Sequence, residues 1–310
     1  MRLRPVLTSI GSLPPFPDSP EAAIRKSVEL QRAHGLEILT DGEQRGDMLS
    51  MYESLPGIRP EGGVPRIVGR IRPLDDPAEF VKIRDLDFLR LTFPELSFKV
   101  SLTGPTTFAF SCASRGAGPT YRSAMDPALH EDLTEAIRPI AHEVHRRGAD
   151  LQIDDPILSQ GMRDYAPVVD RLDEIASEVP RVRASLHVCG GLRRGKVLEA
   201  LLRLKNVSAL NLAFAAPAER ENVSLLERRE WESRDIALGA GCARVQVSHV
   251  GEITTPEEVA SLLRTISERI GADLLRYVVP DCGLRATSAT FVSPILGNLH
   301  QGFLLAFPGS

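Results

Sequence analysis

The chain has few of the residues that mark secreted or membrane-bound proteins. It has only four cysteines in 310 residues, too few and too widely spaced for a disulfide-rich secreted scaffold. No stretch reaches the roughly 18 consecutive apolar residues of a membrane span. The N-terminus shows no apolar core of a signal peptide. These absences predict a cytoplasmic protein with no membrane partner.

An excess of charge of one sign is also missing. The 37 Lys and Arg side chains nearly balance the 41 Asp and Glu side chains, which leaves a formal net charge of −4. Domains that bind nucleic acid usually carry a basic face, so we expect no nucleic-acid partner. With 43% hydrophobic residues, a chain of this length can bury a large core without disulfides.

What the chain does contain is a regular alternation of short apolar runs with longer segments of helical period. Helices are predicted over residues 19–34, 127–147 and 256–270, and the last begins with Thr255-Pro256, a common helix start. Eight apolar runs are candidate strands: 6–12, 37–43, 96–104, 149–156, 183–189, 208–215, 235–243 and 274–283.

Short apolar strands separated by helices are typical of a parallel sheet that is covered on both faces. Eight of them predict a (β/α)₈ TIM barrel, formed as a single domain over residues 1–310. An open doubly wound sheet is the alternative, although no G-x-G-x-x-G motif follows the first strand. Residues 52–95, rich in Pro, Gly and Arg, fit the pattern least. We interpret them as an insertion between the second and third strands, such as a small hairpin over the barrel mouth.

Reactive residues gather where the predicted strands end. In a TIM barrel the carboxyl ends of all strands meet on one face, which carries the active site. We therefore expect side chains that are far apart in sequence to become neighbours there. The strand ends with such residues are Ile10-Gly11-Ser12, Asp41-Gly42-Glu43, Thr103-Gly104-Pro105-Thr106, Asp154-Asp155-Pro156, His187-Val188-Cys189 and Asp281-Cys282-Gly283.

Three of these side chains suggest a metal site. His187 and Cys189 are two residues apart on one strand, so they point to the same side. Cys282, at the end of the last strand, would add a second thiolate. One imidazole and two thiolates suit Zn²⁺, and three protein ligands leave the open position of a catalytic zinc. The alternative is a core histidine with two small buried cysteines.

Four acidic residues belong to the same mouth: Asp41, Glu43, Asp154 and Asp155. Their carboxylates could bind the ammonium group of an amino acid. Alternatively they cap helix N-termini, as loops that precede helices often require, and for Asp41 and Asp155 this structural role is a full explanation.

The remaining candidates have simpler explanations when taken alone. His249 follows the seventh strand, where it could carry a proton or simply be solvated. Cys242 is expected in the core, and no partner in the pattern accounts for Cys112. Trp231 and the charged segment 227–230 are expected on a solvated helix face.

Six motifs in this order resemble the catalytic half of cobalamin-independent methionine synthase. The resemblance extends from about residue 8 to residue 287. Each motif is short, but six in the right order at strand ends are specific. The motifs are I-G-S (10–12), D-G-E (41–43), L-T-G-P-T (102–106), I-D-D-P (153–156), H-V-C (187–189) and P-D-C-G-L (280–284). The resemblance implies the TIM barrel shared by these synthases and the uroporphyrinogen decarboxylases.

The resemblance also implies roles for single residues. Zinc would be held by three of them: His187, Cys189 and Cys282. Homocysteine would be held by four: Ile10, Ser12, Glu43 and Asp154. His249 stands where the family has a histidine proposed to aid proton transfer. The predicted catalytic residues are therefore His249 and, from the homocysteine-binding group, Asp154.

Two departures from the family pattern concern the metal and the methyl donor. The family holds zinc with a glutamate on strand six, where this chain has Asn211 or Ala213. Glu219 or Glu221 could reach in from the following loop. The chain also lacks the N-terminal half that helps full-length synthases bind folate. We therefore expect a methylcorrinoid or a corrinoid protein as donor rather than methyl-folate.

The sequence thus predicts a zinc-dependent enzyme that moves a methyl group onto a thiol, homocysteine, to give methionine. Zinc would convert the thiol into its reactive thiolate, and the protein would position it for in-line displacement. One alternative is alkyl transfer to another thiol such as coenzyme M. Another is a non-catalytic, degenerate barrel that serves as a partner subunit. A decarboxylase needs no zinc, which the H-V-C and P-D-C-G motifs argue against.

Overall fold

The structure of the protein is a computed structural model that describes residues 4–192 and 196–308. In this part of the chain, eight parallel strands form the centre of the molecule. They are β1 (Val6–Leu7), β2 (Ile38–Leu39), β5 (Ser97–Thr103), β6 (Asp150–Asp154), β7 (Ala184–Val188), β8 (Ala209–Ala213), β9 (Ala237–Ala243) and β10 (Leu275–Pro280). The sheet order is β1-β10-β9-β8-β7-β6-β5-β2, and a parallel bridge between Thr8 and Ile38 joins the two outer strands. The predicted TIM barrel is confirmed, and the open doubly wound sheet is excluded.

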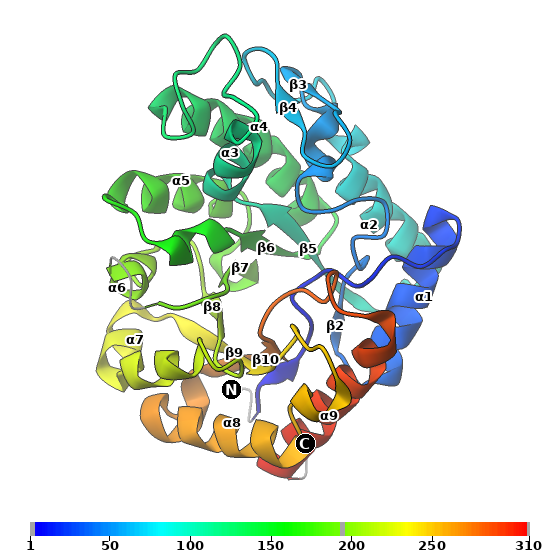
Figure 1. The fold of residues 1–310 in the computed structure, drawn as a ribbon, viewed down its shortest axis with the longest axis vertical. Helices are drawn as coiled ribbons and strands as arrows, with labels where there is room; N and C mark the ends of the chain where they lie inside the picture. Colours follow the sequence, from blue (N-terminus) through cyan, green and yellow to red (C-terminus); the bar gives the residue numbers. More distant parts are fainter. Residues whose placement is uncertain (1–3, 193–195, 309–310) are drawn as a thin grey trace.

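Helices surround this barrel on the outside (Figure 1). They are α1 (Pro20–Ala33), α2 (Val81–Thr92), α3 (Pro105–Ala113), α4 (Pro127–Arg146), α5 (Ala166–Ala176), α6 (Val197–Leu201), α7 (Arg228–Arg234), α8 (Pro256–Ile270) and α9 (Ala289–Ala306). Four of them begin at a proline, whose fixed φ suits the first helical turn. Thr255 and Glu258 form a complete capping box at the start of α8. In the part of the chain that the structure describes, no helix is both long and apolar enough to cross a membrane.

The segment between β2 and β5 is the most irregular part of the fold. A short 3₁₀ helix, η1 (Ser50–Ser54), precedes an antiparallel hairpin of β3 (Ile58–Arg59) and β4 (Arg66–Ile67). The hairpin lies near α3, at one end of the molecule (Figure 1). Helix α2 then returns to the outer layer and packs against β5.

The three residues expected away from the site divide into two groups. Cys112 and Cys242 are fully buried in the core. Trp231 is fully buried as well, so the predicted solvated position is wrong for this residue. Helix α7 is amphipathic: Arg229 and Glu230 are exposed, whereas the indole faces the core. A charged neighbourhood in sequence therefore did not indicate the burial of this one side chain.

Candidate active site

Two cysteines and one histidine meet at the carboxyl end of the barrel. His187 lies on β7, Cys189 directly follows this strand, and Cys282 follows β10. One imidazole nitrogen and the two Sγ atoms all lie within 4.8 Å of one another. Strands β8 and β9 separate β7 from β10 in the sheet, so it is the curvature of the barrel that brings these side chains together.

The imidazole of His187 is held in one orientation. Its Nδ1 lies 3.0 Å from the backbone oxygen of Asn211, its register partner on β8. Its Nε2 is buried and has no hydrogen-bond partner in the described part of the chain. Buried polar atoms are rarely left unpaired, and a metal-binding histidine typically fixes its second nitrogen on a carbonyl. The ring therefore has the arrangement of a metal ligand.

The two thiols influence each other directly. The neighbouring Cys282 lowers the pKa of Cys189, whereas Cys189 and burial together raise the pKa of Cys282 far above its ordinary range. A cation beside both sulfurs would stabilise the two thiolates at once. One nitrogen and two sulfur donors form a set that Zn²⁺ prefers. The residues present thus fit the zinc ion that the sequence predicts.

The sixth strand of the barrel, β8, offers no further ligand. Ala213 has no donor atom, and the Asn211 amide donates to Gln152 Oε1 over 3.0 Å. Among the described residues the Asn211 Oδ1 atom is buried without a hydrogen-bond partner, but it is directed at Gly239 of β9, where an added Cβ would lie 1.8 Å from it. A fourth protein ligand would have to come from another element.

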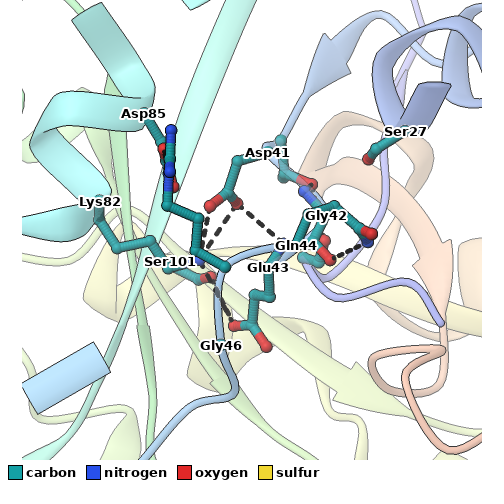
Figure 2. Close-up of polar contacts among 12 residues, drawn as sticks. Ser27, Asp41, Gly42, Glu43, Gln44, Gly46, Lys82, Asp85 and Ser101 are labelled. Atoms are coloured by element: carbon teal, nitrogen blue, oxygen red, sulfur yellow. Dashed lines mark hydrogen bonds and ion pairs between the residues drawn. The ribbon is translucent and has the colours of Figure 1, made fainter. Parts of the chain in front are cut away.

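A buried group of charges lies at the end of β2 (Figure 2). The Lys82 Nζ atom is 2.9 Å from Asp41 Oδ2 and 3.8 Å from Glu43 Oε1. Ser101 Oγ donates to Glu43 Oε1 over 3.4 Å, and the Glu43 N–H donates to Asp41. Burial raises the pKa of Glu43 to about 7, even though Lys82 lowers it. Glu43 therefore titrates near neutral pH.

Asp154 belongs to a second polar network, inside the barrel. Gln152 Nε2 donates to Asp154 Oδ1 over 2.7 Å and to the Ile10 carbonyl over 2.6 Å. Gln152 Oε1 accepts from the Lys99 ammonium over 2.7 Å. Burial raises the pKa of Asp154 and lowers that of Lys99 to about 8. The network fixes the Asp154 carboxylate and the Ile10 backbone relative to each other.

The other predicted residues near the mouth have mainly structural contacts. Asp155 is fully buried and accepts from the Thr107 N–H and hydroxyl over 2.7 and 2.6 Å, so it caps α3. The Ser12 carbonyl accepts from the Leu284 N–H over 2.8 Å. A Cβ at Gly283 would lie 2.2 Å from Ser12 Oγ, so the I-G-S turn packs on the loop that carries Cys282.

His249 does not join these groups. Its side chain is 70% exposed, and its Nε2 is 4.0 Å from Glu252 Oε1. It precedes the short 3₁₀ helix η7 (Val250–Glu252), which follows β9.

Sequence reasoning missed several residues that hold the site. Lys82 and Asp85 occupy core positions of α2, with exposed fractions of 5% and 1%, although most charged side chains avoid such positions. Their helical spacing with Leu86 and Leu89 was the signal that could have revealed them. Lys99, the one charged residue of the strand Ser97–Thr103, was a second signal.

Asp281 was missed as a separate functional residue because it stands beside Cys282. Its carboxylate accepts from three consecutive backbone N–H groups after β8, over 2.7 to 3.0 Å: Phe214, Ala215 and Ala216. Burial raises its pKa to about 7. Asp281 thus fastens the loop after β8 to the segment that carries Cys282.

A cavity of about 380 Å³ opens beside the Lys82 group. Its lining includes Asp41, Glu43, Lys82 and Asp85 but none of the three metal-ligand candidates. Glu43 therefore borders the cavity, and the negative charge of Asp154 raises its pKa further, which shows that the two carboxylates influence each other. The volume suits a small molecule.

Known proteins resemble this chain over most of its length. Residues 92–301 match the family "Cobalamin-independent synthase, Catalytic domain". The methionine synthase of Methanothermobacter thermautotrophicus is 31% identical over 305 residues, which cover 90% of this chain and 93% of that protein. The methionine synthase of Methanocaldococcus jannaschii is 28% identical, with 86% and 83% covered.

Solved structures with the same fold include members of this family. A B12-independent methionine synthase from Shewanella sp. W3-18-1 in complex with selenomethionine has a TM-score of 0.77 at 20% identity, with 97% of both chains covered. A methyltransferase from Methanosarcina mazei has a TM-score of 0.66 at 16% identity, with 99% of this chain and 94% of that chain covered. The chain belongs to the cobalamin-independent methionine synthase family by its catalytic domain, and it is a methyltransferase.

Proposed function

We propose that this protein transfers a methyl group to the thiol of homocysteine, giving methionine, with the help of a zinc ion. One observation carries the proposal: a buried imidazole nitrogen, without a partner among the described residues, faces two thiols at the barrel mouth that also holds two buried carboxylates. Soft donors suit a metal that activates a thiol, and the carboxylates suit the ammonium group of an amino acid.

The metal would be held by His187, Cys189 and Cys282. Zinc in this place would lower the pKa of the bound substrate thiol, so that the reactive thiolate is available at neutral pH. The Asn211 carbonyl keeps the imidazole in the tautomer that leaves Nε2 without a proton. His187 is buried, whereas Cys189 and Cys282 are partly exposed, so a substrate thiol could reach the metal from the side of the two cysteines.

The substrate ammonium would lie between Glu43 and Asp154. Burial raises the pKa of each carboxyl, so a cation placed beside them relieves an existing electrostatic cost. The I-G-S backbone at Ile10 and Ser12 would bind the rest of the amino acid, as the resemblance implies. Gln152 already ties the Ile10 carbonyl to Asp154, so these two parts of the site are preorganised.

For the methyl donor we propose a methylcorrinoid, free or carried by a protein, rather than methyl-folate. The similarity to the methionine synthases of methanogens, of which the first is matched over 93% of its length, supports methyl transfer, and the choice of donor rests on the family resemblance of the sequence alone. For proton transfer we propose His249, which rests on the family resemblance alone. A His249→Asn variant should then lower the rate of methyl transfer and leave the dissociation constant of homocysteine unchanged. Unchanged kinetics would remove His249 from the site.

Calorimetry on the zinc-loaded protein tests the thiol. We expect homocysteine to bind, and Asp154→Asn to weaken its binding, whereas Asp235→Asn, a change of a surface acid, should not. Coenzyme M has no ammonium group, so preferred binding of coenzyme M that is insensitive to Asp154→Asn would favour that substrate instead. Binding of neither thiol would contradict the proposed substrate and favour the non-catalytic alternative.

A further inference from the structure

The carboxylate of Glu219 has an unexplained atom. Glu219 lies in the loop after β8, just before the 3₁₀ helix η6 (Arg220–Leu225). Although the residue is partly exposed, its Oε2 atom is buried and has no hydrogen-bond partner in the part of the chain that the structure describes. Burying an acidic oxygen without a partner is costly, so this atom is expected to have one in the working protein.

The loop that carries Glu219 is fastened to the loop after Cys189. The Asn222 amide donates to the Ala213 carbonyl over 2.9 Å and to the Gly190 carbonyl over 3.0 Å. Its Oδ1 accepts from the Leu192 N–H over 2.9 Å. Asn222 itself is almost completely buried. These bonds hold the start of η6 beside the segment that follows the first thiol ligand.

The opposite end of the same loop is fastened to the second cysteine. Asp281 accepts the three N–H groups at residues 214–216, three to five positions before Glu219. A cavity of about 370 Å³ borders Gly190, Gly191 and Glu219. Glu219 therefore borders the same cavity as the two glycines that directly follow Cys189 in the chain.

We infer that Glu219 is the fourth protein ligand of the metal, in place of the strand-six glutamate of the family. The inference rests on the proposed zinc site. The strand offers no substitute, because Ala213 has no donor and Asn211 Oδ1 packs against Gly239. With Glu219 the donors become one nitrogen, two sulfurs and one oxygen, a set that zinc accepts in tetrahedral sites. A ligand on an irregular loop can leave its place without disturbing the barrel.

Competition with a coloured zinc chelator tests the inference without measuring activity. We expect Glu219→Gln to weaken zinc binding by at least about 10-fold, the lower bound seen when even an outer-shell partner is lost. Glu221→Gln, two residues further in the same loop, is the matched control and should bind zinc like the wild type. Thermal unfolding of the metal-free proteins checks that both variants fold equally well.

Cobalt substitution gives a second readout. In Glu219→Gln the thiolate-to-Co²⁺ absorption should remain, whereas the d–d bands should change because one oxygen ligand is lost. Equal zinc affinity and equal d–d bands in Glu219→Gln and wild type would overturn the inference and leave the three-ligand site intact. If Glu221→Gln weakens zinc binding equally, the effect comes from the loss of any negative charge in this loop, and the inference is overturned as well. A wild type that binds no zinc would instead overturn the proposed function.

Discussion

Replacing Glu43 by Gln should make the protein more stable and less active. Burial raises the pKa of Glu43 from the ordinary 4.5 to about 7. The ionised form is therefore disfavoured in the folded state, by about 3 kcal/mol for a shift of this size. Gln keeps the shape and the acceptor for Ser101 but removes the charge. Without the charge the variant loses the partner of the substrate ammonium.

The sign of the effect depends on pH in a defined way. Because the folded pKa lies above the unfolded one, the folded state holds the proton more tightly, and wild-type stability falls as pH rises from about 4.5 to about 7. The cost is complete above pH 7 and absent below 4.5. Glu43→Gln should thus exceed the wild type by up to about 3 kcal/mol at pH 8 and by little near pH 4.5.

Urea unfolding of the metal-free protein at several pH values measures this difference. Equal m-values would show that only stability has changed. Homocysteine binding to the same zinc-loaded variant should be at least about 10-fold weaker, since a charged partner of the substrate is lost. A variant that is no more stable at pH 8, or a stability difference independent of pH, would refute the assignment of Glu43 as a strained, buried carboxylate.

Three further variants test the remaining networks. Lys99→Met removes a buried ammonium whose pKa is about 8, so this change should stabilise the protein below pH 8. Because Asp154 also loses a nearby positive charge, the pH dependence of homocysteine binding should move to higher pH. An unchanged pH dependence of binding would exclude this role of Lys99. Asp281→Ala leaves three N–H groups unpaired and should cost about 2 to 4 kcal/mol in urea unfolding; a loss below about 1 kcal/mol would contradict the structural role of this carboxylate. Asp155→Ala removes the cap of α3 and should cost about 1 to 2 kcal/mol while homocysteine affinity is kept; a selective loss of affinity would place Asp155 in the binding site.

The barrel was predictable because its signals are local. Apolar runs of strand length and the Thr255-Pro256 helix start can be read from neighbouring residues, and the structure agrees with them. The boundaries were less certain: β2 is only Ile38–Leu39, so the D-G-E motif lies in a turn rather than on the strand. The backbone conformation of a loop, such as the positive φ of 55° at Glu43, cannot be read from a pattern of apolar residues.

The contacts between distant segments were not predictable from the sequence. Lys82 reaches Asp41 across about 40 positions, and nothing in either motif requires that pairing. The Gln152 network joins strands whose register is set only when the barrel closes. Likewise, Asp155 was open to two interpretations until Thr107 was seen to be its partner. The type of each residue suggested its possible roles, and the contact partner seen in the structure decided between them.

Methionine formation from homocysteine tests the central claim most directly. The protein would be freed of metal, then assayed with methylcobalamin or methyl-folate, with and without one equivalent of zinc. We predict product only with zinc, loss of product in Cys282→Ala, and normal activity in Cys112→Ala, whose thiol is buried in the core away from the cluster. Equal activity without zinc or in Cys282→Ala, or no methionine from either donor with the zinc-loaded wild type, would contradict the account.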